Sequence, residues 1–319
     1  MAYIGVINND WKTDLYPYIG KAFDVAYANR LNKLSPIIGE INTNSVSYEL
    51  TGAGGYGEPQ AYDGESLNYG SLLRAFKTTI TPVEYDLAAR IGYKEAKIDK
   101  MGETRRVGTR LGDGMAMKVY LMCLRMFGSA FTASVHGGDG VSWANAAHPV
   151  ASDSSTQSSR THNAKSSGET FSNLITDQLS VAAITAAQAQ ANRFVTPDGM
   201  PFLCEMDTLL VSPELEAEAK KICGENAKLT PNQAENVNPC MDMQYIVIGG
   251  GNDGFTANQW AVCDRRLMKE LVNIVYNTKP TVMHDVLDNP LITQFVSYAD
   301  FGVGWGDARQ IIFSNGSGT

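Results

Sequence analysis

Residues 81–127 read TPVEYDLAARIGYKEAKIDKMGETRRVGTRLGDGMAMKVYLMCLRMF, and this stretch decides the fold that the sequence predicts. Thr81 suits an N-cap, Pro82 suits the first helical position, and Glu84 completes a capping box. Apolar residues then recur mostly every three or four positions, which is the period of a helix with one buried face. The recurring residues are Leu87, Ile91, Ile98, Met101, Leu111, Met115, Val119, Met122 and Met126. The pattern therefore predicts a long amphipathic helix.

Such a helix of about 45 residues would be about 70 Å long. A compact domain of 319 residues is only about 50 Å across, so the helix would extend past its own domain and need cover from elsewhere. Glycines inside the stretch oppose continuity, since each costs about 1 kcal/mol relative to alanine in a helix interior. The cluster of Gly112, Asp113 and Gly114 is the expected bend or break. One continuous helix and two collinear helices are both compatible with the pattern.

The composition narrows the class of protein. Apolar residues make up 44% of the chain, which is enough for a large core. The net charge of −8 leaves no strong basic footprint for nucleic acid, so any DNA contact would be local and independent of base sequence. The five cysteines stand far apart without a CxxC pair, which favours buried thiols in a reducing compartment. The sequence shows no secretory signal and no apolar run of 18 residues, so we expect no membrane partner.

Two extended elements precede the central stretch. The apolar face of Asp14 to Leu34 predicts a helix that Pro36 ends, and because it precedes any core-like pattern it looks like an arm laid along something else. Residues 45–80 change to the alternating period of half-buried strands, with a turn signal at Thr51 to Pro59. This is the pattern of a long β-hairpin, and an isolated two-stranded hairpin is marginally stable in water. Both elements therefore call for a neighbour.

The remainder of the chain reads as mixed α/β. The Ser/Thr-rich tract from Ser152 to Ser172 predicts an exposed loop. From Asn173 onward, strand patterns around Leu209, Tyr245 and Trp260 alternate with helices, including an alanine-rich helix capped by Ser180. Pro280 to Pro290 reads as a connector, and Leu291 to Phe313 as strands broken by glycines. The expected fold class is α+β.

No motif for catalysis or for cofactor binding emerges. Gly249, Gly251 and Gly254 resemble a dinucleotide-binding fingerprint, but the following residues read as a strand and not as the helix that would hold a pyrophosphate. A hairpin turn is the preferred interpretation, and a nucleotide-binding enzyme is the minor alternative. The four histidines lack metal-ligand spacing, and His148 before Pro149 is interpreted as structural. We therefore expect no enzyme activity, no cofactor and no metal.

The order of the elements resembles the major capsid protein of tailed bacteriophages, which has the Hong Kong 97 fold. The phrase Asn145-Ala146-Ala147-His148-Pro149, followed by Ser172-Asn173-Leu174 and Leu179-Ser180, is similar to one seen in many phage head proteins. The opening Asp14-Leu15-Tyr16-Pro17 looks most like the Mu-like major head subunits. The resemblance covers most of the chain, and it rests on the order of these phrases, since none is a catalytic signature.

The resemblance implies a division of the chain into five parts. These are an N-terminal arm (1–44), an extended hairpin or E-loop (45–80), a peripheral (P) domain with the spine helix and the Ser/Thr-rich loop (81–172), an axial (A) domain (173–284) and returning P-domain strands (285–319). The implied function is that of a structural subunit that assembles into pentamers and hexamers of an icosahedral head. That head would enclose double-stranded DNA without sequence specificity.

The resemblance also implies partners and a location. The partners are copies of the same chain, a separate scaffolding protein, a portal and, in some heads, a decoration protein. The location is the virion, after a period in the host bacterial cytoplasm. Residues 45–76 contain no lysine, so we expect no covalent cross-linking through the E-loop. An encapsulin-like compartment shell, which encloses cargo enzymes, and a tail or decoration protein are the alternatives.

Candidate contacts between subunits lie on the two extended elements. These candidates are Leu15, Phe23, Tyr48, Tyr56, Glu58, Tyr62, Arg74 and Phe76. Expansion of such a shell would reorient the hairpin and bend the long helix, and Gly112 and Gly114 are the candidate bend points.

Overall fold

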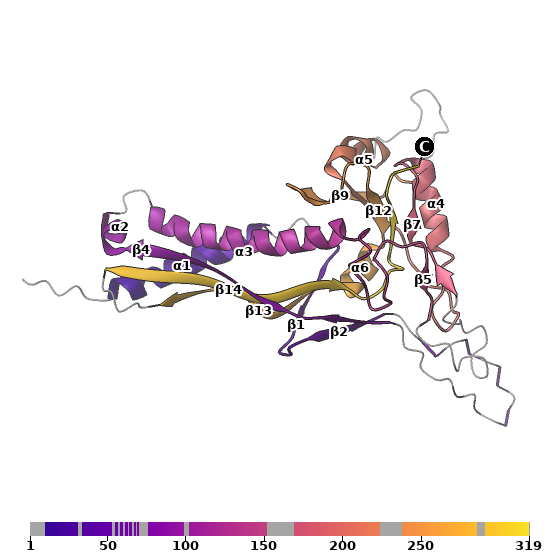
Figure 1. The fold of residues 1–319 in the computed structure, drawn as a ribbon, viewed down its shortest axis with the longest axis horizontal. Coiled ribbons are helices and arrows are strands. Elements are labelled where there is room, and N and C mark those ends of the chain that lie inside the picture. Colours follow the sequence, from indigo (N-terminus) through magenta and orange to yellow (C-terminus); the bar gives the residue numbers. More distant parts are fainter. Residues whose placement is uncertain are drawn as a thin grey trace, which may run out of the picture.

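The computed structural model describes residues 10–30, 34–52, 76–98, 102–151, 169–223, 238–285 and 291–318, together with part of 55–69. The helices are α1 (Asp10–Arg30), α2 (Tyr93–Ile98), α3 (Glu103–Gly128), α4 (Val181–Ala191), the 3-10 helix η3 (Pro213–Leu215), α5 (Glu216–Ile222) and α6 (Arg265–Leu271). The strands are β1 (Gly39–Asn42), β2 (Tyr48–Thr51), β3 (Lys77–Ile80), β4 (Val83–Gly92), β5 (His148–Pro149), β6 (Thr170–Phe171), β7 (Leu174–Ile175), β8 (Thr208–Val211), β9 (Gln244–Val247), β10 (Gly249–Gly250), β11 (Asp253–Gly254), β12 (Trp260–Cys263), β13 (Val272–Asp285), β14 (Ile292–Trp305) and β15 (Ile311–Ser314). Figure 1 shows a long limb, in which α1 and α3 lie along β4, β13 and β14, and a compact lobe around β12.

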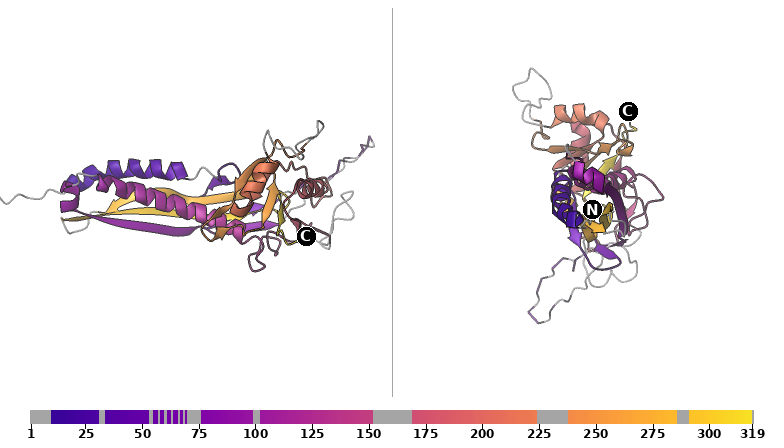
Figure 2. Two further views of the ribbon diagram at one scale, coloured as in Figure 1. Left: turned by 90° about the horizontal axis from the view of Figure 1, so that it is seen from above. Right: turned by 90° about the vertical axis from the view of Figure 1, so that its left-hand side faces the viewer.

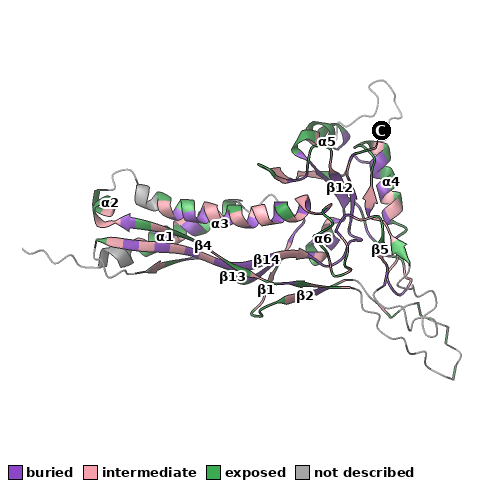
Figure 3. Cartoon of the chain, viewed as in Figure 1, coloured by how far each residue is buried: buried purple, intermediate pink, exposed green. Residues whose placement is uncertain are grey.

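The long limb has two layers, a four-stranded sheet and the helices on one of its faces. The strand order is β1-β13-β14-β4, antiparallel except for β1, which joins β13 in parallel. Helix α3 contacts β14 and β4, and α1 contacts β13, so both helices lie along the sheet (Figure 2). Side chains such as Phe23, Val119, Phe295 and Phe301 are fully buried in the limb core. Figure 3 shows buried segments along α3, β4 and β14. Burial of this apolar surface is the main stabilisation of the limb.

The helix expected over 81–127 is wrong in its first part, because Val83–Gly92 is strand β4. This strand pairs with β14 along its whole length. The spacing of four between Leu87 and Ile91 fits either element, because such residues share a face in a helix and also in a strand. Thr81 and its neighbours therefore precede a strand and do not cap a helix. The local spacing thus permits a helix or a strand, and pairing with β14, which is distant in the sequence, makes this segment a strand.

The helical part of the stretch is divided, but not where the sequence analysis places the break. Helix α2 ends at Ile98, and α3 begins after Gly102, whose φ is +70°. From there α3 continues for 26 residues, or about 39 Å, without a break at Gly112 or Gly114. The alternative of two helices is thus correct in number, and the expected position of the break is wrong.

Two glycines of α3 allow it to approach α1 closely. A Cβ atom on Gly108 would lie 2.5 Å from the carbonyl oxygen of Ile19, and one on Gly112 would lie 2.5 Å from that of Phe23. Positions four apart lie on the same face of a helix, so both glycines face α1. Their role in this conformation is close helix packing, which accounts for residues of low helix propensity inside α3.

Helix α1, expected as an arm, lies along the limb of its own chain. Both of its ends lie four residues before the expected ones. Ile19 and Phe23 are fully buried in the limb core. The hydroxyl group of Tyr16 donates a hydrogen bond of 3.0 Å to the carbonyl oxygen of Val282 on β13. The cover that the sequence analysis assigns to another chain is therefore provided by α3 and β13.

The compact lobe contains a five-stranded sheet of order β7-β15-β12-β8-β9. Strands β8, β9 and β12 confirm the strands expected around Leu209, Tyr245 and Trp260. The glycines after β9 form the hairpin β10–β11, with Gly249 opposite Gly254, which confirms the turn interpretation. A second core, separate from that of the limb, packs between this sheet and helices α4 and α5.

The last strands of the chain are divided between the two sheets. Strand β13 already belongs to the limb sheet, whereas β15, within 285–319, returns to the lobe sheet. Pro280, expected in a connector, lies inside β13 at a register shift between Thr278 and Thr281. A proline is tolerated there because an irregular position needs no ladder hydrogen bond. The chain thus crosses between limb and lobe after α3, at β13 and again after β14.

The hydroxyl oxygen of Ser180 accepts a hydrogen bond of 3.1 Å from the N–H of Ala183, which confirms the expected N-cap of α4. We expect Ser180→Ala to lower the free energy of unfolding by about 1 kcal/mol, because one helical N–H loses its partner. Urea denaturation would measure this change. Thr185→Ala on the same helix is the control, since its exposed hydroxyl only donates to the carbonyl of Val181. Equal losses in both variants would contradict the capping role.

Candidate functional site

A β-hairpin is attached where the limb meets the lobe. Strands β2 and β3 form its base, with Tyr48 opposite Ile80, which confirms the expected hairpin at this end. Leu50 and Ile80 pack on Val275 in a small apolar cluster. Lys77 on β3 forms an ion pair with Glu49 on β2. Figure 1 shows β2 beside the limb near its junction with the lobe. The base is thus anchored to the limb sheet.

Two glycines, Gly304 and Gly138, allow the rest of the chain to approach strand β3 of this base closely. A Cβ atom on Gly304 of β14 would lie 2.6 Å from side-chain atoms of Ile80. On the other side, the N–H of Gly138 donates a hydrogen bond of 3.0 Å to Oγ1 of Thr78, and a Cβ atom on Gly138 would overlap the carbonyl oxygen of Lys77. At Gly138 the contact is with backbone atoms, which cannot turn aside, so only a residue without a side chain allows this approach.

Beyond the base, the described hairpin residues expose large side chains. Tyr56 and Tyr62 are 63% and 64% exposed, Leu67 is 68% exposed and Tyr69 is 80% exposed. Scattered single apolar residues are normal on a protein surface, but several in one segment indicate an interaction site. Tyrosine is especially suited to such a site, because its ring buries a large apolar area and its hydroxyl stays satisfied.

The expected contact residues fall into groups. Tyr56, Glu58 and Tyr62 are exposed on the hairpin, as a contact with another chain requires. Leu15 and Phe23 pack in the limb core, and Phe23 is fully buried, so in this conformation it is not free to meet a neighbour. This is a correction to the sequence analysis, which did not foresee that α1 packs on α3.

The remaining candidate contact residues and the two candidate bend points lie at the hairpin base, outside the described residues, or inside α3. Tyr48 and Phe76 are half-buried at the hairpin base, and Arg74 lies outside the described residues. The two glycines named as bend points lie inside α3, where one faces α1 and the other faces Leu87 on β4. Sequence reasoning missed Gly108, although its spacing of four from Gly112 was a signal for close helix packing.

His148 is buried and fully hydrogen-bonded at the junction of limb and lobe. Its Nδ1 atom lies 2.6 Å from Oδ2 of Asp139, and its Nε2 atom lies 3.1 Å from both the carbonyl oxygen of Trp143 and Oδ1 of Asn173. Its side chain is 0% exposed, so the ring has no access to a ligand from solvent. The structural interpretation of His148 is confirmed.

Asn173 ties three segments together in the same place. Its Nδ2 atom donates to the carbonyl oxygens of Trp143 (2.7 Å) and Ala308 (3.2 Å), and its Oδ1 atom accepts from the N–H of Asn145 (2.9 Å). Residues 145–149 and 172–174, two of the three phrases that are similar to phage head proteins, thus meet in one cluster. The polar residues of these phrases are needed because the buried backbone groups at the junction require hydrogen-bond partners.

A buried ion pair that the sequence analysis missed lies close by. The guanidinium group of Arg309 binds both carboxylate oxygens of Asp307 (3.2 and 2.9 Å), the carbonyl oxygen of Val195 (2.9 Å) and that of Val150 (2.9 Å). It also lies 4.6 Å from the ring centre of Phe171. Since its donors are used by the chain itself, this arginine is structural.

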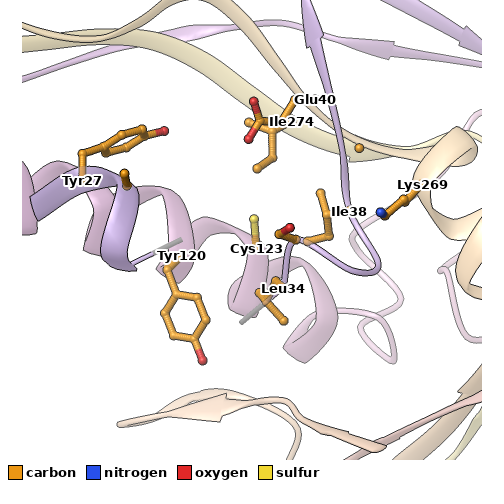
Figure 4. A pocket seen from close by; sticks show the side chains of 11 residues that line it. Tyr27, Leu34, Ile38, Glu40, Tyr120, Cys123, Lys269 and Ile274 are labelled. Carbon is orange, nitrogen blue, oxygen red and sulfur yellow. The ribbon is translucent and has the colours of Figure 1, made fainter. Parts of the chain in front are cut away.

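A hollow of about 500 Å³ lies between α1, α3, α6 and β13 (Figure 4). Leu34, Ile38 and Ile274 contribute apolar side chains to it. Burial raises the pKa of the Cys123 thiol to about 12, so this group is protonated at neutral pH and is not a nucleophile. Burial also raises the pKa of Tyr27 to about 12, which removes it from acid–base work near neutral pH.

Within the residues that the structure describes, no group of three or more His, Cys, Asp or Glu side chains could hold a metal ion. No helix in the described part of the chain is long and apolar enough to span a bilayer. All five cysteines are buried and free, which confirms that they serve as small buried residues.

The described chain thus consists of a limb, a lobe and a hairpin base, beyond which several tyrosines are exposed. The sequence profile of the family described as phage capsid protein matches residues 76–312, which is nearly three quarters of the chain. The chain therefore belongs to the phage capsid protein family, and it is a structural subunit of a capsid shell. A comparison with curated proteins found no similar sequence.

Solved structures share this fold at low sequence identity. The capsid of cyanophage P-SCSP1u is 9% identical with a TM-score of 0.53, and the match covers 87% of this chain and 86% of that chain. The procapsid of bacteriophage JBD30 is 11% identical with a TM-score of 0.52, over 95% and 74% of the two chains. A virus-like particle from Pyrococcus furiosus is 9% identical with a TM-score of 0.50, over 93% and 97%. Likenesses at these identities establish the fold alone.

Proposed function

We propose that this subunit forms the pentamers and hexamers of an icosahedral phage head that encloses double-stranded DNA. The observation that carries the proposal is the hairpin, whose tyrosines are exposed in the single chain. Covering them with a neighbouring copy would contribute about 25 cal/mol per Å² of buried apolar surface. Each contact can be weak, because a closed shell repeats it in every subunit.

The parts of the chain take the roles of the Hong Kong 97 fold in this proposal. The hairpin is the E-loop, α3 is the spine helix, the limb is the P-domain and the lobe is the A-domain. The similarity of the opening residues to Mu-like head subunits extends the proposal to that branch of the family. We infer that the subunit has no enzymatic activity, since the histidine and arginine clusters are engaged within the chain.

The partners follow from the same role. Copies of this chain, a separate scaffolding protein, a portal and decoration proteins would bind it, and the enclosed DNA would contact it without sequence specificity. The subunit would reside in the host bacterial cytoplasm before assembly and in the virion afterwards. The net charge of −8 agrees with a shell that encloses DNA without binding it tightly.

Expression of the chain with and without a scaffolding protein, followed by electron microscopy of the sedimenting material, tests the proposal. Closed shells are the expected result, and tubes or a stable solitary monomer would refute it. An encapsulin-like compartment shell, which shares the Hong Kong 97 fold, is the second candidate. Nuclease treatment and mass spectrometry of particles from infected cells separate the two, since one holds DNA and the other holds cargo protein.

We expect the triple variant Tyr56→Ser, Tyr62→Ser and Tyr69→Ser to abolish shells while the subunit stays folded. These side chains are exposed in the single chain, so their loss removes contact area without a cavity. Sedimentation measures assembly, and circular dichroism measures folding. Tyr18→Ser is the matched control, since Tyr18 on α1 is 71% exposed and lies outside the hairpin. Normal shells from the triple variant would contradict the role of the hairpin.

A further inference from the structure

The sheet of the lobe ends in two edge strands of different character. At one edge, the hydroxyl oxygen of Ser172 accepts a hydrogen bond of 3.2 Å from the N–H of Leu174 on β7, and the hydroxyl donates one of 2.9 Å to the carbonyl oxygen of the same residue. The outward backbone groups of Leu174 are thus satisfied within the chain. The other edge is β9, which Figure 1 shows at the border of the lobe. In the described part of the chain, β8 is the only strand that pairs with it.

Half of the backbone groups of β9 point away from β8. The N–H groups of Gln244, at the start of β9, and Ile248, just after its end, donate to carbonyl oxygens in and just before β8 (3.2 and 2.8 Å). In a parallel ladder, alternate residues of a strand bond to the same neighbour, so the N–H and carbonyl groups of Tyr245 and Val247 face the open side. None of the described residues forms a hydrogen bond with these groups. Such a row of unpaired groups is a template for another strand.

The edge strands of the limb sheet have features that oppose such pairing. Strand β4 exposes Glu84, Asp86 and Arg90, and charged side chains on an edge strand disfavour pairing with another chain. Strand β1, at the opposite edge, contacts α6. By contrast, β9 contains no charged residue and no proline. Its edge is therefore open to an added strand both by its composition and by its position.

Apolar layers lie on both faces of β9. Ile246 packs on the limb core, whereas Tyr245 and Val247 pack on the lobe core. A strand that continues the sheet would extend both layers, so it needs apolar side chains on both of its faces. A strand that alternates between apolar and polar residues would place its polar side chains against one of the two layers.

Residues 3–7, with the sequence Tyr-Ile-Gly-Val-Ile, meet this requirement. In an extended chain, side chains 3 and 7 share one face and side chains 4 and 6 share the other, so both faces are apolar. Aromatic and β-branched residues also favour a strand. The internal stretches 53–75, 152–168 and 224–237, which the structure describes in part or not at all, all contain charged residues and no apolar run of this length.

We propose that residues 3–7 of one copy of this chain add a strand to the open edge of β9 in a neighbouring copy. The outward N–H and carbonyl groups of Tyr245 and Val247 then gain partners, and the apolar side chains of the added strand extend both layers. The contact is heterologous, because one copy provides its N-terminal segment and the other provides a sheet edge. Contacts of this kind can close into rings, as pentamers and hexamers require. Only this ring closure rests on the proposed function, since the strand addition itself needs no more than a second copy.

The segment comes from another copy because the β9 of its own chain is out of reach. Helices α1 and α3 run parallel, with Ile19 beside Gly108. Leu124 on α3 lies next to β10, the short strand that follows β9. At 1.5 Å per residue, Leu124 is about 38 Å from Asp10 along the limb. The chain from Ile7 to Asp10 spans only about 10 Å when fully extended.

A fluorescent peptide with the sequence of residues 1–9, titrated into the soluble full-length subunit, tests the edge in solution. We expect saturable binding, measured by fluorescence anisotropy. Val247→Pro removes one outward N–H and leaves the bonds to β8 intact, because proline is tolerated on an edge strand. The affinity of this variant for the peptide should fall by at least about tenfold, because a backbone hydrogen bond is lost and the proline ring obstructs the edge.

Val247→Thr is the matched control, since it keeps the N–H and has a side chain of nearly the same shape. It should bind the peptide, whereas a peptide with Ile4→Lys should bind to neither the natural chain nor this variant. Circular dichroism checks that both variants are folded. The proposal is overturned if the natural chain does not bind the peptide, or if Val247→Pro binds it as well as the natural chain does.

Photo-cross-linking identifies the partner segment in the full chain, and it decides the question if Val247→Pro does not fold. Benzoylphenylalanine replaces Gln244, whose side chain is exposed, and copies with and without nitrogen-15 label are mixed before illumination. Mass spectrometry should find position 244 of one copy joined to residues 1–9 of another. Cross-links within one copy, between two β9 strands or to any other segment would overturn the proposal. Because this contact needs no closed shell, cross-linked small oligomers or tubes would refute the proposed function and leave the strand addition standing.

Discussion

The double variant Gly108→Ala and Gly112→Ala is expected to separate α1 from α3 and to lower the free energy of unfolding by up to about 4 kcal/mol. The new methyl groups would lie 2.5 Å from the carbonyl oxygens of Ile19 and Phe23, where the contact is with backbone and cannot turn aside. Overpacking of this kind costs about 1–3 kcal/mol per site and exceeds the gain in helix propensity of about 1 kcal/mol. Urea denaturation measures the loss.

Gly114→Ala is the matched control in the same helix. Its methyl group would lie 2.8 Å from Cδ2 of Leu87, the end of a flexible side chain that is 43% exposed. We expect this variant to be as stable as the natural chain or slightly more stable, because alanine favours the helix. If Gly114→Ala and Gly112→Ala lose the same stability, the packing argument is wrong and a bending role for both glycines gains support. The two interpretations of these glycines are therefore separable by experiment.

Asn173→Ala should lower the free energy of unfolding by about 4 kcal/mol, since several buried groups lose their partners at once. The carbonyl oxygens of Trp143 and Ala308 lose a donor, and the N–H of Asn145 loses an acceptor. Each unsatisfied buried group costs about 1–3 kcal/mol. Thermal unfolding and the yield of soluble subunit would measure the effect.

Asn173→Asp distinguishes lost hydrogen bonds from a lost side chain. The aspartate has nearly the same shape, but an oxygen replaces the Nδ2 atom that donates to two carbonyl oxygens. We expect it to be at least as destabilising as Asn173→Ala, because it buries a charge among acceptors. Asn315→Ala is the control and should change stability by less than about 0.5 kcal/mol, since its side chain accepts only from Ser317 at the surface. A stable Asn173→Asp variant would show that the cluster is not a determinant of the junction.

These two sites differ in how far the sequence reveals them. The phrases around Asn145, His148 and Asn173 are recognisable, and the resemblance to phage head proteins rests on them in part. That His148 and Asn173 meet at one junction is not visible in sequence, because 25 residues separate them. The spacing of Gly108 and Gly112 was readable, but its meaning depended on a helix to pack against.

Local patterns determined much of the compact lobe and the base of the hairpin. Ser180 caps α4, the strands around Leu209 and Trp260 form as expected, and the glycines at 249–254 make a hairpin. In each case a cap, a run of β-branched or aromatic residues, or a turn glycine acts over a few residues. Such signals do not depend on distant partners, so they can be read directly.

In the limb, local patterns are compatible with more than one secondary structure, and pairing between distant segments determines which one forms. Leu87 and Ile91 suit a helix or a strand, and β4 became a strand because β14, more than 200 residues later, pairs with its whole length. Pro280 argues against a strand, yet β13 continues through it because a register shift removes the need for its hydrogen bond. Helix α1 reads as an uncovered arm, and it lies against α3 because two glycines admit its backbone. The sequence by itself determined that the chain contains helices and strands with apolar faces that must be buried. Only the tertiary structure decided which surface buries each face, because burial energy depends on what is adjacent in space and not on what is adjacent in the chain.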